Sequence, residues 1–138
     1  MINYNIKITK ENINNSNTDI FGDWFNENIN VETNPFPYVI IPEFIKTEYY
    51  NKIKSKFPSE PNEKWWKYEN PLEVKYALDN LELMDGVISN VFYSLSHDNA
   101  VDKFKKIFNI PDLEYDPHCH GAGLHMHPRY GRLNMHLD

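Results

Sequence analysis

The spacing of apolar residues predicts two consecutive helices in the second half of the chain. Between Met84 and Leu95 the apolar residues recur at intervals of three and four positions, which places them on one face of a helix. Asp85 stands where an N-cap residue is expected. A second helix with its own apolar face is expected from about Asn99, and Pro111 lies just past its end.

The first half of the chain has weaker patterns. The β-branched and aromatic run Tyr38–Ile41 lies between two prolines, which predicts a buried strand. We expect a helix after it, capped by Thr47 and ended by Pro58. The segment 58–80 follows no clear period and is interpreted as irregular, with a strand or an extended arm as the alternative.

Short extended pieces are predicted after the helices. They are Leu113–Asp116, Ala122–Met126 and Arg132–Asp138, and the sequence HPRYG between the last two suits a hairpin connection. If side chains alternate along the last piece, one face of this strand is apolar and packs in a core, and it carries Leu133, Met135 and Leu137. The other face lines a polar pocket and carries Arg132, Asn134, His136 and Asp138. The order of elements indicates an α+β fold.

Length and charge narrow the classes of function. The 138 residues suffice for one domain, which we divide into an Asn-rich segment, 1–34, and a folded part, 35–138. The net charge of −6 makes nucleic acid a poor partner, and no apolar run approaches the roughly 20 residues of a membrane span. The single cysteine, Cys119, cannot form an internal disulfide, and no signal peptide is recognisable, so we expect a cytoplasmic protein.

Five of the six histidines lie between His118 and Asp138. If the last piece is a strand, His136 and Asp138 point to the same side, and an imidazole with a carboxylate suits Fe(II). An H-x-D triplet alone is weak evidence, because any surface strand with alternating polar residues can contain one. His118 and His120 are interpreted as turn residues, since a zinc site would need further ligands. His125 and His127 share a strand face and can equally be polar groups within a pocket.

The run GAGLHMHPRYGRLNMHLD resembles the entry to the double-stranded β-helix of iron(II)- and 2-oxoglutarate-dependent oxygenases of the prolyl-hydroxylase-like group. The upstream parts follow the same order: PFPYVIIPEF, a helix ending in FP, a Trp-containing arm, two helices and Asp116-Pro117. The resemblance covers about residues 35–138. It implies N-terminal helices packed on the start of a jelly-roll core, truncated after the H-x-D strand.

The resemblance also implies the chemistry. His136 and Asp138 would be iron ligands, and Fe(II), 2-oxoglutarate and O2 would together hydroxylate a substrate. Apart from the resemblance, we expect Asn134, on the ligand face of the last strand, to contact the cosubstrate or substrate, and His125 to be a second cosubstrate-binding residue. The family's third ligand, a later histidine, and the basic residue that binds 2-oxoglutarate have no counterpart in this sequence, and Arg132 replaces the second of two glycines. We therefore expect the missing strands to come from a longer chain or a partner, and no succinate formation by the 138-residue chain.

Two other functions fit the same sequence. The chain can be a non-catalytic binding or interaction module that keeps the helical part, or a His-rich metal-binding protein in which Cys119 and several histidines hold zinc. The sequence does not distinguish a small-molecule substrate from a protein substrate.

Overall fold

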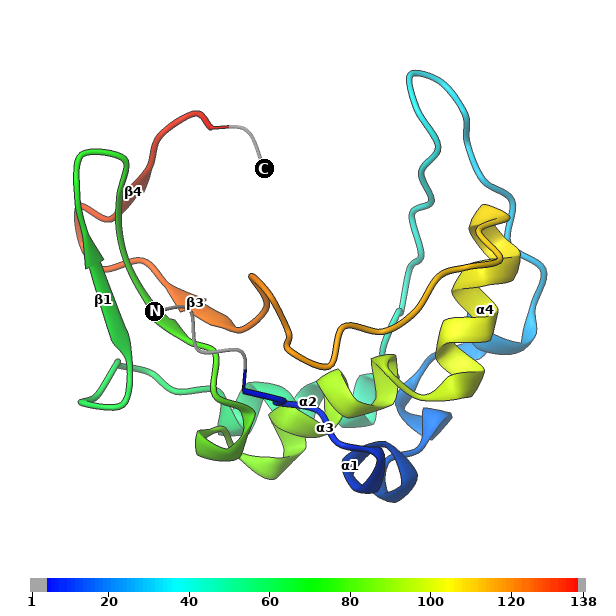
Figure 1. The fold of residues 1–138 in the computed structure, drawn as a ribbon, viewed down its shortest axis with the longest axis horizontal. Coiled ribbons are helices and arrows are strands. Elements are labelled where there is room, and N and C mark those ends of the chain that lie inside the picture. The colour runs from blue at the N-terminus through cyan, green and yellow to red at the C-terminus, as the bar shows by residue number, and fades with distance from the viewer. Residues whose placement is uncertain (1–4, 137–138) are drawn as a thin grey trace.

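The computed structural model describes residues 5–136 and shows an α+β architecture, with helices at one end and an antiparallel sheet at the other (Figure 1). The helices are α1 (Lys10–Asn15), η1 (Thr18–Ile20), η2 (Asp23–Asn26), α2 (Thr47–Lys56), η3 (Leu81–Leu83), α3 (Gly86–Leu95) and α4 (Asp98–Phe108), of which the η segments are 3-10 helices. The strands are β1 (Trp66–Glu69), β2 (Glu73–Leu78), β3 (Leu124–Met126) and β4 (Arg132–Leu133). The α+β prediction is confirmed. Within residues 5–136 no helix is long and apolar enough to cross a bilayer.

The two helices predicted from apolar spacing are confirmed. The carboxylate of Asp85 accepts a hydrogen bond from the backbone N–H of Val87 at 2.9 Å, so it caps α3 as expected. Helix α4 begins at Asp98, and the ring of His97 caps it by accepting from the backbone N–H of Asn99 at 3.2 Å. The helix ends at Phe108, and the left-handed backbone of the C-cap residue Asn109 (φ 54°) stops further α-helical bonding.

Two predictions for the segment before α2 are wrong. Tyr38–Ile41 forms no buried strand: Tyr38 makes one isolated bridge with Glu32, and Ile40 is 82 % exposed. The flanking prolines lack the N–H groups that would extend this pairing into a ladder. Thr47 does not cap α2 but is its first residue, after Lys46, which gives no side-chain cap.

The segment 58–80 contains a β-hairpin, which is the alternative to the irregular structure expected from the sequence. Strands β1 and β2 pair antiparallel from Trp66 opposite Ala77 to Glu69 opposite Val74. The turn between them is closed by Asn70, whose side-chain oxygen accepts from the backbone N–H groups of Leu72 and Glu73 at 2.9 and 3.1 Å. The later strands pair with this hairpin.

The segment HPRYG, residues 127–131, is not a hairpin turn. Both β3 and β4 pair antiparallel with β2, with Met126 opposite Tyr76 and Arg132 opposite Val74. The chain therefore runs along a single edge of β2 and bulges outward between these two pairs. The N–H of Gly131 donates to the carbonyl of Pro128 at 2.7 Å and closes the bulge. The hairpin prediction failed because Pro and Gly mark a reversal without showing which strand the next segment joins.

Two hydrophobic clusters hold the fold together. The first joins α1, α3 and the sheet, and its buried members are Ile8, Ile13, Trp65, Leu78, Leu81, Met84, Ile88, Cys119 and Leu124. The second joins the N-terminal 3-10 helices to α4, and its buried members are Ile20, Phe21, Trp24 and Ala100. Residues of the Asn-rich N-terminal segment thus pack in both clusters alongside α3 and α4.

The prediction that Leu133 and Met135 lie in a core is wrong: Leu133 is 47 % exposed and Met135 fully exposed. The first cluster covers the end of the sheet near Leu78 and does not reach β4. Strand β4 is also only two residues long, and the chain bends at Met135, so strict alternation does not continue to His136. Leu137 lies outside the described residues.

Candidate functional site

The sheet has a core face and an outer face. Residues directly opposite each other in antiparallel strands point to the same side. The core face carries Tyr76, Leu78, Leu124 and Met126, which pack in the first cluster. The pairs Trp66–Ala77, Tyr68–Lys75, His125–Ala77 and Leu133–Glu73 belong to the outer face. The outer face therefore combines aromatic, basic, acidic and imidazole groups.

Glu73 and Lys75 form an ion pair on the outer face. The Lys75 ammonium lies 2.8 Å from the Glu73 carboxylate, and the two side chains are only 14 and 19 % exposed. Lys75 also lies 5.3 Å from the centre of the Tyr68 ring. The hydrogen bond from Lys75 lowers the pKa of Glu73 below its usual range, and the charge of His136 adds slightly in the same direction. His136 is therefore within electrostatic reach of this pair.

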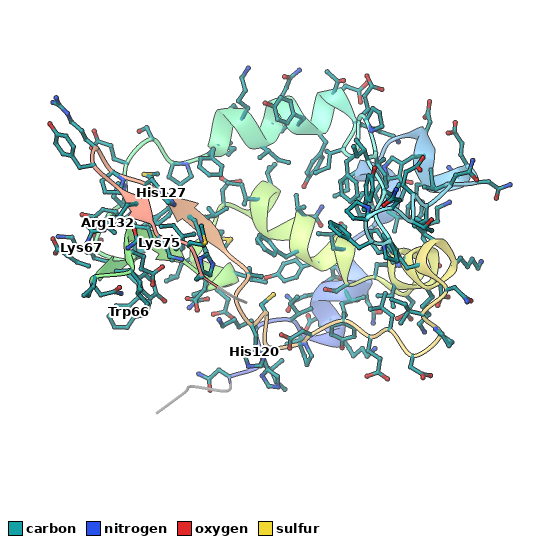
Figure 2. All side chains as sticks on the ribbon, turned by 90° about the horizontal axis from the view of Figure 1, so that it is seen from above. Trp66, Lys67, Lys75, His120, His127 and Arg132 are labelled. Atoms are coloured by element: carbon teal, nitrogen blue, oxygen red, sulfur yellow. The ribbon has the colours of Figure 1, made fainter. Side chains whose placement is uncertain are left out.

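His125 lies next to this ion pair. Partial burial lowers the pKa of His125 below its usual range, and the positive charge of Lys75 and the neighbouring His127 add to the effect. The carboxylate of Glu73 acts in the opposite direction and does not cancel it. The lowered pKa favours the neutral ring, the form in which histidine can bind a metal or accept a hydrogen bond. Figure 2 shows Lys75 and His127 on the sheet and His120 apart from them.

The ring of His136 is oriented by the residue two positions before it. Its Nδ1 lies 2.9 Å from the backbone carbonyl of Asn134, and since a carbonyl only accepts, Nδ1 carries the hydrogen. In the neutral ring the lone pair is then on Nε2. Asn134 is itself anchored: its backbone N–H donates to the carbonyl of Leu72 at 2.8 Å, and its side-chain amide donates to the carbonyl of Pro71 at 3.0 Å.

The predicted iron ligands can be compared with the structure only in part. Asp138 lies outside the described residues, so its position relative to His136 is not described. Among residues 5–136, no group of three or more His, Cys, Asp and Glu side chains is arranged to hold a metal ion. Of the four predicted site residues, the structure describes His125, Asn134 and His136.

His118 and His120 lie in a separate turn, as the sequence indicated. The carboxylate of Asp116 accepts from the backbone N–H groups of His118 and His120 at 2.9 and 2.7 Å. These bonds lower the pKa of Asp116 below its usual range. Cys119 is buried between the two histidines, and burial raises the pKa of its thiol. The thiolate that zinc requires is therefore disfavoured here.

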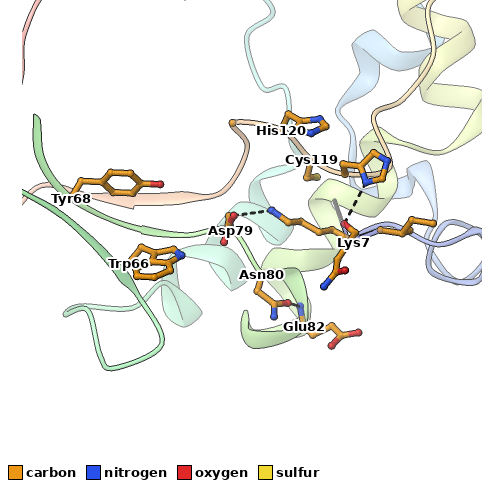
Figure 3. A pocket seen from close by; sticks show the side chains of 12 residues that line it. Lys7, Trp66, Tyr68, Asp79, Asn80, Glu82, Cys119 and His120 are labelled. Carbon is orange, nitrogen blue, oxygen red and sulfur yellow. Dashed lines mark hydrogen bonds and ion pairs between the residues drawn. The ribbon is translucent and has the colours of Figure 1, made fainter. Parts of the chain in front are cut away.

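A cavity that was not predicted from the sequence lies beside this turn. It has a volume of about 880 Å³ and lies between the turn, β1 and the segment that contains Lys7 (Figure 3). Trp66 is 69 % exposed and lines this cavity, whereas Trp65 is buried. The available signal was the alternation of Trp66 and Tyr68, which places two rings on one strand face.

Comparisons with known proteins identify no relative: no family model, curated protein or solved structure matches this chain.

Proposed function

We propose that this chain forms the first part of an Fe(II)- and 2-oxoglutarate-dependent dioxygenase that hydroxylates a substrate, with His136 and Asp138 as two of the metal ligands. The observation that carries the proposal is the ring of His136, which donates from Nδ1 to the Asn134 carbonyl. Histidines that bind metals through one nitrogen usually donate from the other to a carbonyl or carboxylate, which fixes the tautomer.

The arrangement of the sheet is compatible with the proposal. Helices cover the core face, and the outer face carries the Glu73–Lys75 pair and His125, with His136 nearby. In a jelly roll a second sheet faces the first, and polar residues between the sheets can form a site. We propose that further strands, from a continuing segment or a partner chain, would cover this face and contribute the third ligand.

The donor set agrees with the chemistry of the metal. One imidazole and one carboxylate on a single side of an ion, completed by a second imidazole, suit Fe(II) and leave open positions. Bound iron would supply the activation of O2 with 2-oxoglutarate as cosubstrate. The chain's own contribution is positional: Asn134, anchored to the β1–β2 turn, fixes the direction of the His136 ring.

A metal titration tests the proposal without requiring turnover. Co(II) is the probe, because its visible absorption reports coordination, and the 138-residue chain is titrated under anaerobic conditions with and without 2-oxoglutarate. We expect 1:1 binding that weakens about tenfold or more in His136→Ala and Asp138→Asn, since each change removes a ligand. The matched control, His120→Ala, removes a histidine from the separate turn and should bind as the unmodified chain does.

Two results would overturn the proposal. Equal Co(II) affinity in His136→Ala and the unmodified chain would remove His136 from the metal site. Loss of binding in His120→Ala, with no effect of His136→Ala or of 2-oxoglutarate, would favour the alternative of a His-rich metal-binding protein.

A further inference from the structure

The cavity beside the histidine turn has an aromatic side. Trp66 and Tyr68 line it from one strand, β1, and are 69 and 39 % exposed. Figure 3 shows the two rings on one side of the cavity, and Lys7, Cys119 and His120 on the other. A tryptophan ring this exposed beside a cavity offers apolar, π-electron-rich surface that a ligand can contact. Tyr68 already makes one cation–π contact, with the ammonium of Lys75 at 5.3 Å from the ring centre.

The charged groups of the cavity favour a cation over an anion. The ammonium of Lys7 is paired with the carboxylate of Asp79 at 2.8 Å, so these two charges largely cancel. Glu82 also lines the cavity, and within residues 5–136 its carboxylate makes no ion pair. Among the Lys, Asp and Glu side chains that line the cavity, one negative charge is therefore left over. The whole chain, with a net charge of −6, would add to the attraction of a cation.

We propose that this cavity binds a small organic cation, an alkylammonium or quaternary ammonium group, with the ring of Trp66 as its platform and Glu82 as its countercharge. Cations of this kind are recognised by the electron-rich face of an aromatic ring together with a nearby carboxylate, and among aromatic side chains Trp binds cations most strongly. The Lys7–Asp79 pair forms the polar wall between the rings and the histidine turn.

This site and the proposed metal site lie toward opposite ends of the same outer face of the sheet. Trp66 pairs with Ala77, four positions along β2 from Glu73, which at about 3.3 Å per residue is roughly 13 Å, and Tyr68, opposite Lys75, lies between them. His136 acts on Glu73 at that far end. The inference therefore stands without the proposed iron chemistry, and its test involves no metal.

The test is a titration followed by nuclear magnetic resonance of the three tryptophan indole N–H groups in the full chain. The probe is tetramethylammonium chloride, with sodium chloride at equal ionic strength as the salt control and tert-butanol as a neutral molecule of similar shape. We expect the resonance of Trp66, assigned by its loss in Trp66→Leu, to shift saturably with tetramethylammonium alone. The buried Trp24 and Trp65 should not respond. Titration with Nα-acetyl-lysine amide shows whether the preferred cation is a primary amine.

Variants locate the site. Since Trp66→Leu removes the reporter, its affinity is followed by the backbone N–H resonances of Gly121 and Asn80, and it should fall about 2- to 30-fold. Glu82→Gln should weaken binding about 2- to 5-fold. The controls Tyr130→Leu, an exposed ring outside the cavity, and Glu63→Gln, an exposed carboxylate elsewhere, should bind as the unmodified chain does. The proposal is overturned if tert-butanol binds equally well, if no saturable shift occurs, or if Trp66→Leu binds tetramethylammonium with unchanged affinity.

Discussion

The carboxylate of Asp116 holds His120 at two points: Oδ2 lies 2.7 Å from the backbone nitrogen and 2.9 Å from the ring Nδ1. The same carboxylate accepts from the backbone N–H of His118, so one side chain fixes the turn that borders the cavity. An ionised carboxylate is a stronger acceptor than a protonated one. The shape of this turn should therefore depend on the charge of Asp116.

We predict that Asp116→Asn lowers stability at neutral pH and flattens its dependence on acid. The hydrogen bond from the backbone of His120, followed by that of His118, holds the pKa of Asp116 below its usual range. The contribution of Asp116 is thus present above its unfolded pKa, near 4, and is lost as the pH falls through the lower folded pKa. Urea midpoints measured between pH 2 and pH 7 test this prediction. Asp112→Asn, an exposed neighbour, is the control, and identical acid profiles for both variants would contradict it.

We predict that His125 titrates below its usual range because of its place on the outer face of the sheet. Partial burial is the larger cause and the charge of Lys75 the next. A folded pKa below the unfolded value, near 6.5, means that stability falls as the pH drops from 6.5 through the folded pKa. An NMR titration of the His125 ring gives the pKa directly. Lys75→Met should raise the pKa of His125 only part of the way to its usual value, and Lys67→Met should leave this pKa unchanged. A larger rise in Lys67→Met than in Lys75→Met would be inconsistent with this geometry.

We predict that Gly131→Ala is destabilising by about 1–3 kcal/mol, the usual cost of overpacking. A Cβ at Gly131 would lie 2.8 Å from the carbonyl oxygen of Pro128 and 3.0 Å from Cβ of His127, inside the bulge that connects β3 to β4. Gly86→Ala is the matched control: a Cβ there meets nothing within 4 Å at the start of α3. It should be neutral or stabilising by up to about 1 kcal/mol. Chemical denaturation of both variants gives the comparison, and equal stability would exclude a tight bulge.

We predict that Leu81→Ala costs about 2–5 kcal/mol of unfolding free energy, because the side chain is 1 % exposed within the first cluster and its removal leaves a cavity. Leu83→Ala, two positions along η3 and 43 % exposed, should change stability by no more than about 0.5 kcal/mol. Urea unfolding curves measure both. Similar losses for the two variants would mean that η3 does not pack through Leu81 alone.

The helices α3 and α4 could be predicted because their determinants are local. Apolar residues three and four positions apart share one face, and the cap of α3, Asp85, lies two residues from the N–H group that it accepts from. Every feature that fixes such a helix is contained in about a dozen consecutive residues.

The strands could be predicted only in part, because a strand is defined by its partner. Tyr38–Ile41 has a suitable composition for a strand, yet only Tyr38 pairs, with Glu32. The bulge at 127–131 has the composition of a hairpin turn, yet β2 accepts the segments on both sides of it. Composition shows that a segment can be extended, and only the tertiary structure decides what it pairs with.

The candidate sites likewise combine features that follow from the sequence with features that only the tertiary structure decides. The sequence by itself determined the α+β class and the crowding of histidines near His136, since both follow from residue order. The cavity depends on Lys7 meeting Asp79, 72 positions later, and on Trp66 facing the histidine turn. No local pattern encodes such contacts, because they arise when distant segments bury their apolar residues in a common core and bring their polar neighbours together.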